Sequence, residues 1–506
     1  MRALHKERPA LGAGMACACL AALCLGGCSL APKYERPDAP VAATWPDHYL
    51  PEGYLPAGEG LAAPASRRAA DIGWRTFFSD ERMRNLIALA LENNRDLRVA
   101  ALNIERARAL YRIQRADQLP GVSATGEESA QNTPAVLSNT GERVVSHQYS
   151  VGAGVSGWEL DFFGRIQSLK EAALEDYLAS EEALKSARIS LVAETAAACL
   201  NLVADRERLD IARNTLESQQ ASYEMIRRRR ELGVSSELDL WQAQTSVDSA
   251  RVDIARYTSQ AARDLTALST LVGVQVSPGM LPARTLGELP MSTDIPVGLS
   301  SSVLLRRPDI LRAEHLLKAA NANIGAARAN FFPRVTLTAF AGTAGPELSD
   351  LFDGGTGLWR FTPQVSLPLF EGGRNIANLK VSETDKAIAV ADYEKAIQTA
   401  FQEVSDALIL RATLARELKA QESLTHAATQ TYNLSEERYR QGIDSYLTVL
   451  DSQRFMYSSQ QNLITVRLNR ELNQILLYKT LGGGWTADGS SVAAESAASA
   501  ENVEDK

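Results

Sequence analysis

The chain contains 506 residues with a formal net charge of −8 at pH 7; 45% of the residues are hydrophobic and 23% are charged. This length permits several domains or one large repeated unit. The ordinary composition argues against a wholly disordered chain. The mildly acidic balance argues against nucleic acid as the main partner, because phosphate binding requires a basic surface.

The first 27 residues have the composition of a secretory signal peptide. Three basic residues precede an apolar segment from about Leu11 to Leu25. This apolar core is too short for a membrane-spanning helix and has the wrong flanking residues. We find no later segment that is long and apolar enough to span a membrane as a helix.

The predicted signal peptide ends in the sequence Leu-Gly-Gly-Cys at residues 25–28. This motif resembles a bacterial lipobox, which predicts cleavage before Cys28 and attachment of lipid to that cysteine. Ser29 follows, and a residue other than Asp at this position favours the outer membrane. Acyl chains contribute about 0.8 kcal/mol per buried methylene group, so several of them can anchor a chain without a spanning helix. Residues 28–70 are then a proline-rich strap.

The remainder of the chain contains an internal duplication. Leu119-Pro120 matches Phe332-Pro333 at an offset of 213 residues, and Gly164-Arg165 matches Gly373-Arg374 at an offset of 209. The change of offset predicts one longer loop near residues 121–155. We therefore expect a first repeat at 71–275, a linker at 276–302, a second repeat at 303–485 and a disordered tail at 486–506.

Each repeat contains long segments without helix breakers. A medium helix is predicted at about 96–118 and again at 309–331. No proline occurs between Arg165 and Ser277 or between Arg374 and Leu481, and proline in a helix interior costs about 3 kcal/mol. Within these tracts Gly233 and Gly442 mark the turns. A helix over residues 165–232 would measure about 100 Å.

Short alternating segments lie between the predicted helices. In the second repeat, apolar residues at 335, 337 and 339 alternate with polar ones, and the pattern returns at 359–369. The first repeat is less regular, with alternation at 150–156. Such segments are typical of a transmembrane β-barrel with a wet interior, although a soluble antiparallel sheet with one face on a core has the same pattern. Four strands per chain cannot close a barrel, so strands of several copies would have to combine.

Several motifs carry a resemblance to the TolC-like outer-membrane efflux factors, in particular to the lipoprotein branch typified by OprM that serves resistance-nodulation-division pumps. They are Arg306-Arg307-Pro308-Asp309-Ile310, residues 319–327, Trp158-Glu159-Leu160-Asp161, Tyr439-Arg440-Gln441-Gly442 and Leu481-Gly482-Gly483-Gly484-Trp485. The resemblance implies a mainly α, internally duplicated chain with a β-barrel portion. Three copies would form a twelve-stranded transmembrane β-barrel continuous with a long periplasmic α-helical barrel.

The resemblance also implies partners and a gate. The homotrimer would dock to a periplasmic adaptor protein and an inner-membrane pump. The turns at Gly233 and Gly442 would form the periplasmic mouth, which rings of Leu447 and Asp451 would constrict. Three leucines can dewet a narrow pore and three carboxylates attract cations. Thr448 occupies a position where some relatives carry a second aspartate.

Three other interpretations stay open at this stage. A secreted enzyme finds no support, because the histidines are isolated and no zinc-ligand spacing or phosphate-binding loop occurs. We therefore predict neither catalysis nor a cofactor apart from the lipid on Cys28. A periplasmic coiled-coil scaffold lipoprotein and a metal-ion efflux duct are the alternatives to a duct for drugs. The sequence does not identify the exported substrates.

Overall fold

The computed structural model describes residues 29–42, 45, 72–139, 141–282, 285–289 and 301–484. The predicted signal peptide, Cys28 and the predicted disordered tail lie outside the described residues. The chain divides into two compact units, which are described separately. The first consists of Met1–Asp38, Asn103–Glu181 and Arg312–Tyr393, and the second of Ala39–Leu102, Glu182–Leu311 and Glu394–Lys506.

The first unit contains a sheet and the helices that enter and leave it. In chain order these are α4 (Arg95–Ala116), β1 (Val122–Thr133), η2 (Ala135–Leu137), β2 (Val144–Leu160), α5 (Arg165–Glu231), α7 (Pro308–Ala329), β3 (Arg334–Gly345), β4 (Gly357–Ser366) and α8 (Arg374–Arg440). The order helix, two strands, long helix therefore occurs twice. The ends of α4 and α7 lie within two residues of those predicted from the sequence.

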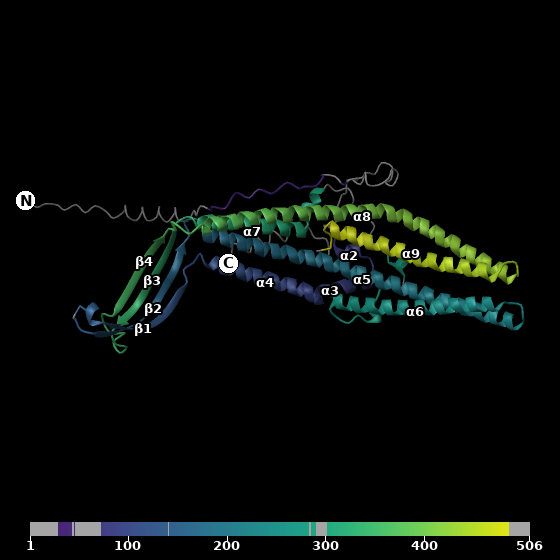
Figure 1. Cartoon of the computed structure of the whole chain (residues 1–506), viewed down its shortest axis with the longest axis horizontal. Helices are drawn as coiled ribbons and strands as arrows, with labels where there is room; N and C mark the ends of the chain where they lie inside the picture. Colours follow the sequence, from purple (N-terminus) through teal and green to yellow (C-terminus); the bar gives the residue numbers. More distant parts are fainter. Residues whose placement is uncertain are drawn as a thin grey trace, which may run out of the picture. The chain divides into compact units, whose positions relative to one another are not determined.

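The four strands form one antiparallel sheet in the order β1-β2-β3-β4, as Figure 1 shows. A bulge interrupts the pairing of β2 with β3 between Val155 and Trp158. Gly157 has a φ of 63° there, and its N–H donates to Oγ1 of Thr338 at 3.1 Å. Glycine is suited to this left-handed conformation because it has no Cβ.

The prediction of a longer loop near residues 121–155 is wrong. The connection between β1 and β2 is no longer than that between β3 and β4. The additional residues instead lengthen β2, which has 17 residues against 10 in β4. The bulge absorbs part of this excess, because it adds residues to one strand without a partner on the other.

The second unit contains the remaining helices and an aromatic core. These helices are α2 (Trp74–Phe77), α3 (Glu81–Asn93), α6 (Glu237–Val272), η3 (Pro278–Met280), η4 (Leu286–Glu288), η5 (Ser301–Arg306) and α9 (Tyr446–Thr480), with parts of α5 and α8. The rings of Phe77 and Tyr478 stack at 4.0 Å between centroids. The Tyr478 hydroxyl donates to the carbonyl of Ile72 at 2.5 Å, which joins the end of α9 to the residues before α2.

Helix α5 includes one window that is long and apolar enough to span a membrane by length and composition, which the sequence analysis did not identify. Within this window 61% of the residues are buried inside the protein. Burial of this extent is typical of a core helix, because a lipid-facing helix exposes its apolar side chains. Most residues of this window therefore pack inside the protein.

Candidate functional site

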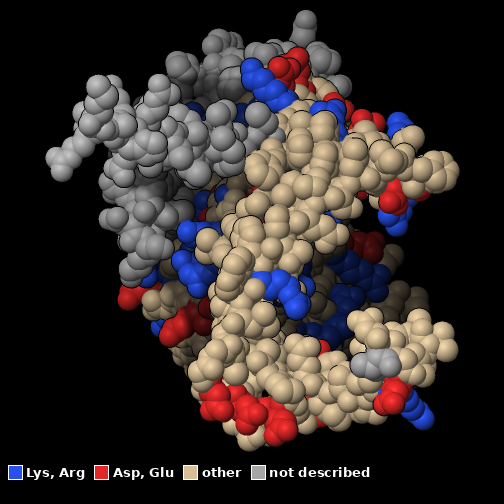
Figure 2. Space-filling model, turned by 90° about the vertical axis from the view of Figure 1, so that its left-hand side faces the viewer, with Lys and Arg blue, Asp and Glu red and all other residues tan. Residues whose placement is uncertain are grey.

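At the strand ends next to the helices, one face of the sheet is apolar across all four strands. The register aligns Val122 with Val155, Val155 with Ala339, and Ala339 with Phe361. Along β4 this face includes Trp359, which is 77% exposed, and Phe361, which is 60% exposed. Large apolar side chains gathered at this exposure on one face of a sheet are typical of a surface covered by lipid or by another chain. Figure 2 shows the side of the molecule on which the strands lie, and most of the surface in the middle of this view carries no charged side chains.

The opposite face of the sheet is polar. Thr338 pairs with Thr362, and Thr336 pairs with Gln364. Small residues continue this face on β2, where a Cβ on Gly152 would lie 2.6 Å from the ring of Phe340 and 2.5 Å from a backbone oxygen. The first repeat therefore uses glycine where the backbone of β3 and a phenylalanine ring approach closely, which weakened its alternating pattern in the sequence.

The outer edges of β1 and β4 are free. Each of these strands has one hydrogen-bonded neighbour within the described residues, and β1 has 12 residues and β4 has 10. Long open edges are templates for pairing with another strand. About eight strands are required to close a barrel, so this sheet cannot close on itself.

The predicted glycine turns join long helices in the second unit. Gly233 lies between α5 and α6 with a φ of 75°, and Gly442 lies between α8 and α9 with a φ of 77°. At the first turn Gly233 N–H donates to the carbonyl of Arg230, and Val234 N–H donates to that of Arg229, both at 2.9 Å. The same pair of bonds recurs at Gly442. These are Schellman motifs, in which a left-handed glycine ends the helix.

The two turns differ at the start of the returning helix. Ser236 and Asp239 form a reciprocal capping box at α6, with both hydrogen bonds at 3.0 Å. At the equivalent positions in the second repeat, Ser445 makes no side-chain cap and Thr448 replaces the aspartate. A threonine cannot return the capping bond with a charged oxygen, so α9 begins without the stabilisation that α6 has.

A shared core holds the two helical hairpins together near their turns. It consists of Ile226, Ala243, Tyr432, Tyr439, Tyr446, Val449 and Leu450. Burial raises the pKa of Tyr446 to about 12, and its hydroxyl has no hydrogen-bond partner among the described residues. The guanidinium of Arg229 lies 4.9 Å from the centre of the Tyr439 ring. The first turns of α9 are therefore fixed through their buried side.

Leu447 and Asp451 lie on the opposite, exposed side of α9. Leu447 is 50% exposed and Asp451 is also exposed, whereas Leu450 is fully buried. A spacing of four residues brings the two side chains to the same face of a helix. The two predicted gate residues are thus adjacent and free of the hairpin core.

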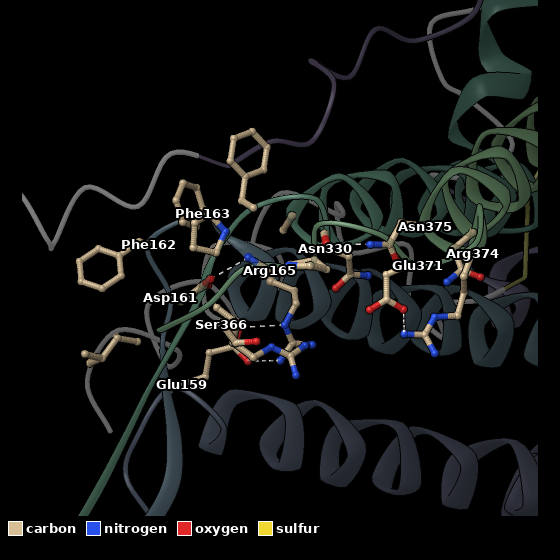
Figure 3. Close-up of a pocket in the computed structure, with 17 residues that line it drawn as sticks. Glu159, Asp161, Phe162, Phe163, Arg165, Asn330, Ser366, Glu371, Arg374 and Asn375 are labelled. Atoms are coloured by element: carbon tan, nitrogen blue, oxygen red, sulfur yellow. Dashed lines mark hydrogen bonds and ion pairs between the residues drawn. The ribbon is translucent and has the colours of Figure 1, made fainter. Parts of the chain in front are cut away.

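A cavity of about 480 Å³ lies where the strands meet the helices in the first unit. Figure 3 shows its charged side chains, with Phe162 and Phe163 directed away from them. Oε2 of Glu159 lies 2.7 Å from Nη2 of Arg165 and 3.2 Å from Nε of Arg334. The Glu159 carboxylate is therefore paired with two guanidinium groups and is not a free base.

Asp161 organises the corner next to this cavity. Its carboxylate accepts from the backbone N–H of Arg165 at 2.7 Å and from that of Gln167 at 2.8 Å. The first N–H groups of a helix have no partner within the helix, and a carboxylate there also favours the helix dipole. Asp161 therefore sets the direction in which α5 leaves β2.

The strap after the predicted lipid site runs along α7, which the sequence analysis did not identify. Arg328 donates to the carbonyl of Leu30 at 3.3 Å, and Asn321 donates to that of Pro32 at 2.8 Å. Gly325 lets the strap approach closely, because a Cβ there would lie 2.8 Å from the nitrogen of Ala31. The small and amide side chains on α7 could have indicated a close contact with another segment. The sequence does not reveal which segment, because it lies almost 300 residues away.

A buried acid fixes the other end of this contact. Glu314 is 3% exposed and accepts hydrogen bonds from the Tyr34 hydroxyl at 3.1 Å and from Nε and Nη2 of Arg36 at 3.1 and 2.6 Å. Burial raises the pKa of Glu314, but the hydrogen bond and charge of Arg36 together with Lys318 outweigh it, and the net pKa is lowered. Glu314 is therefore ionised at neutral pH and holds the strap against α7.

Comparison with known proteins agrees with this arrangement. The family model described as "Outer membrane efflux protein" matches residues 86–274 and 299–483. The "Antibiotic efflux pump outer membrane protein ArpC" of Pseudomonas putida is 50% identical over 468 residues, which cover 92% of this chain and 94% of that protein. The "Toluene efflux pump outer membrane protein TtgC" of the same species has the same identity and coverage.

A solved structure has the same fold. The Neisseria gonorrhoeae MtrE outer membrane channel, in its open state, superposes with a TM-score of 0.81 at 36% identity, covering 92% of this chain and all of that one. The predicted resemblance, the outer-membrane location and the role in efflux are confirmed by these comparisons, and no catalytic family is indicated. This chain belongs to the outer membrane efflux protein family.

Proposed function

We propose that three copies of this chain form the passive exit duct of a tripartite efflux pump, with a transmembrane β-barrel built from the strands of all copies. The observation that carries this proposal is the sheet with an exposed apolar face and two free edges. Lipid accepts the apolar face but not the edges, since it offers no partner for backbone N–H and C=O groups. Three copies would supply twelve strands, which is enough to close a barrel with a polar interior.

The strap supports lipid attachment at Cys28. From Leu30 to Arg36 an extended chain covers about 20 Å, and the helical segment from Arg328 to Glu314 covers about 21 Å, so residues 30–36 of the strap are fully extended along α7. Its contacts bring Ser29 to the end of α7 that precedes β3. An acyl chain on Cys28 would then enter the membrane beside the inner ends of the strands.

The lipid assignment has a direct test. The Cys28→Ser variant should lose labelling by radioactive palmitate, whereas Cys199→Ser should keep it, because Cys199 is fully buried. Continued labelling of the Cys28→Ser variant would contradict the assignment. If residues 1–27 are a lipoprotein signal peptide, the Cys28→Ser variant should also keep them, because the lipoprotein peptidase cleaves before a lipid-carrying cysteine.

The helix turns support a gated, partner-binding mouth. We propose that Leu447 and Asp451 constrict the duct and that the turns at Gly233 and Gly442 contact the periplasmic adaptor. Apolar side chains are exposed at both turns, with Val234 at 63%. Exposed apolar groups at a hairpin turn are poorly explained by solvent contact alone. The adaptor would in turn connect the duct to the inner-membrane pump.

We propose small apolar and amphipathic compounds, including antibiotics and organic solvents, as the substrates. The names of two relatives at 50% identity specify antibiotic and toluene efflux, and these proteins cover almost the whole chain. No group of three or more His, Cys, Asp or Glu residues in the described part of the chain could hold a metal ion. This favours the drug and solvent duct over the metal-ion duct.

Conductance in a planar lipid bilayer tests the duct. The purified, acylated protein should insert as a trimer and carry a steady ion current. A stable folded protein that never conducts would support the periplasmic scaffold instead. Strains that lack the gene should accumulate toluene and antibiotics, and a strain that accumulates only metal ions would support the metal-ion duct.

A further inference from the structure

The two edge strands each carry one charged residue on the polar face of the sheet. On β1 this residue is Glu127, which pairs with Ser150, and on β4 it is Arg360, which pairs with Phe340. Both side chains are exposed, and neither forms an ion pair or side-chain hydrogen bond within the described residues. Glu128, the neighbouring acid, lies on the other face, where it accepts from the Tyr149 hydroxyl at 3.0 Å. Each free edge therefore presents one charge on the same side of the sheet, and the two charges have opposite signs.

Glu127 and Arg360 lie at the same depth in the membrane if the strands cross it at the usual tilt. The registers align Val122, at the inner end of β1, with Phe361 on β4. Strands about 4.8 Å apart and tilted by about 40° shift by about 12 Å, or three to four residues, between the first and fourth strand. The residue of β4 level with Val122 is therefore close to Val365, which is also at an inner strand end.

From these two ends the charges stand at the same height. Glu127 lies five residues beyond Val122, and Arg360 lies five residues before Val365. Five residues correspond to about 17 Å along either strand. When β4 of one copy lies beside β1 of the next, the same tilt offsets residues of equal height by about 4 Å along the strands. The two side chains then lie about one residue from direct pairing, which is within reach of an ion pair between these long side chains. Their faces match as well, because both belong to the polar set.

We propose that Glu127 of one copy forms an ion pair with Arg360 of the adjacent copy across each seam between β1 and β4. The inference rests on the proposed trimeric barrel and names the contact that aligns its copies. A slip of one residue would move one of the charges to the lipid face, so the pair specifies the register of the seam. The remaining residues of both edge strands on the polar face are uncharged and carry no such information.

Cysteine cross-linking measures this alignment. Cysteines directly opposite each other on adjacent strands fit the Cα separation of about 4.4–6.8 Å that a disulfide requires. The double variant Glu127→Cys/Arg360→Cys should oxidise to covalent dimers and trimers on non-reducing gels. Cys199 does not interfere, because burial raises the pKa of its thiol to about 12. Cross-linking should exceed that of the controls by tenfold or more.

Two matched controls use the same strands. Glu128→Cys/Arg360→Cys directs the thiols to opposite faces, and Ser123→Cys/Arg360→Cys keeps the face but separates the heights by four residues. Neither should cross-link. A conducting trimer in which the Ser123 pair cross-links, or in which the Glu127 pair does not, would overturn the proposed contact and leave the duct intact. A protein that is monomeric before any substitution would overturn the duct itself.

Charge exchange provides an independent readout. Glu127→Arg and Arg360→Glu should each lower the temperature at which the trimer dissociates in dodecyl sulfate, because each puts like charges together at the seam. The double exchange should restore most of that loss. Additive losses in the double variant would show that the two residues do not meet.

Discussion

Arg36 and Glu314 are 278 residues apart in the sequence, yet Nη2 of the arginine lies 2.6 Å from Oε2 of the glutamate. The acid is 3% exposed, while the arginine side chain is 47% exposed. The pair therefore holds an exposed strap against a buried charge. Because the strap directly follows Cys28, this contact fixes where the proposed lipid leaves the protein.

Replacing Arg36 should release the strap. In Arg36→Met, Glu314 keeps its burial but loses its main partner, and we expect a cost of about 1–3 kcal/mol. Limited proteolysis between residues 29 and 42 should become faster while α7 stays protected. Glu35→Gln, which changes an exposed neighbour, serves as the control and should be cleaved at the rate of the parent protein.

The same contact has a pH dependence. The folded-state pKa of Glu314 is lowered, so its stabilisation is present above the ordinary carboxyl range and is lost as the pH falls below about 4. Proteolysis of the parent strap should accelerate in acid, and the Glu314→Gln variant should lack this response. Equal acid sensitivity in both would contradict the assignment.

Gly273 should tolerate alanine less well than the turn glycines Gly233 and Gly442. At Gly233 and Gly442 a Cβ would have open space, so Gly→Ala adds only the cost of a left-handed alanine, about 1–2 kcal/mol. At Gly273, with a φ of 78°, the Cβ would also lie 2.4 Å from the carbonyl oxygen of Asn93. Thermal unfolding in detergent should therefore show a larger loss for Gly273→Ala than for either turn variant. Three equal losses would refute this reading of the turns.

Asp264 should make the second unit less stable as the pH rises. Burial and the nearby Asp205 carboxyl raise its pKa to about 6, and its Oδ2 has no hydrogen-bond partner among the described residues. Asp205 itself pairs with Arg208 at 2.6 Å. The folded state thus binds a proton that the unfolded state releases, so stability falls between about pH 4 and 6.

The Asp264→Asn variant keeps the shape of the protonated acid. Its melting temperature should exceed that of the parent at pH 8 by about 1–2 °C, and the difference should disappear at pH 4. Asp248→Asn on the same helix gives the control, because that acid is exposed and its pKa is lowered, chiefly by the hydrogen bond from Gln244. If the melting temperature at pH 8 rose only in Asp248→Asn, the assignment of the pH effect to Asp264 would be wrong.

The proposed gate predicts changes in current without changes in fold. Leu447 and Asp451 are exposed, and substitutions at such positions usually alter stability by less than about 0.5 kcal/mol. Leu447→Ala should raise the leak current of the closed protein, since a dewetted ring needs bulky apolar groups. Asp451→Ala should reduce the preference for cations, measured as a shift in reversal potential under a salt gradient. Glu437→Gln, which removes an exposed acid on α8, should leave both unchanged.

The helices and turns could be predicted because their determinants are local. Absence of proline, two isolated glycines and the repeated Gly-Arg step were sufficient to locate α5, α8 and the turns after them to within a few residues. The alternation of β3 and β4 was also visible, although the predicted second segment ran three residues past Ser366, the end of β4. The gate residues came from resemblance, and the fold adds that they share the exposed side of α9.

Only the tertiary structure decided the remainder. Strand β1 has no regular alternation, and its pairing with β2 identifies it as a strand. The bulge at Gly157, the strap on α7 and the Asp205–Asp264 pair each depend on residues that are distant in sequence. A local pattern specifies which face of an element is apolar. It does not specify which distant segment covers that face, because that choice is made by packing, hydrogen bonding and burial in the folded chain.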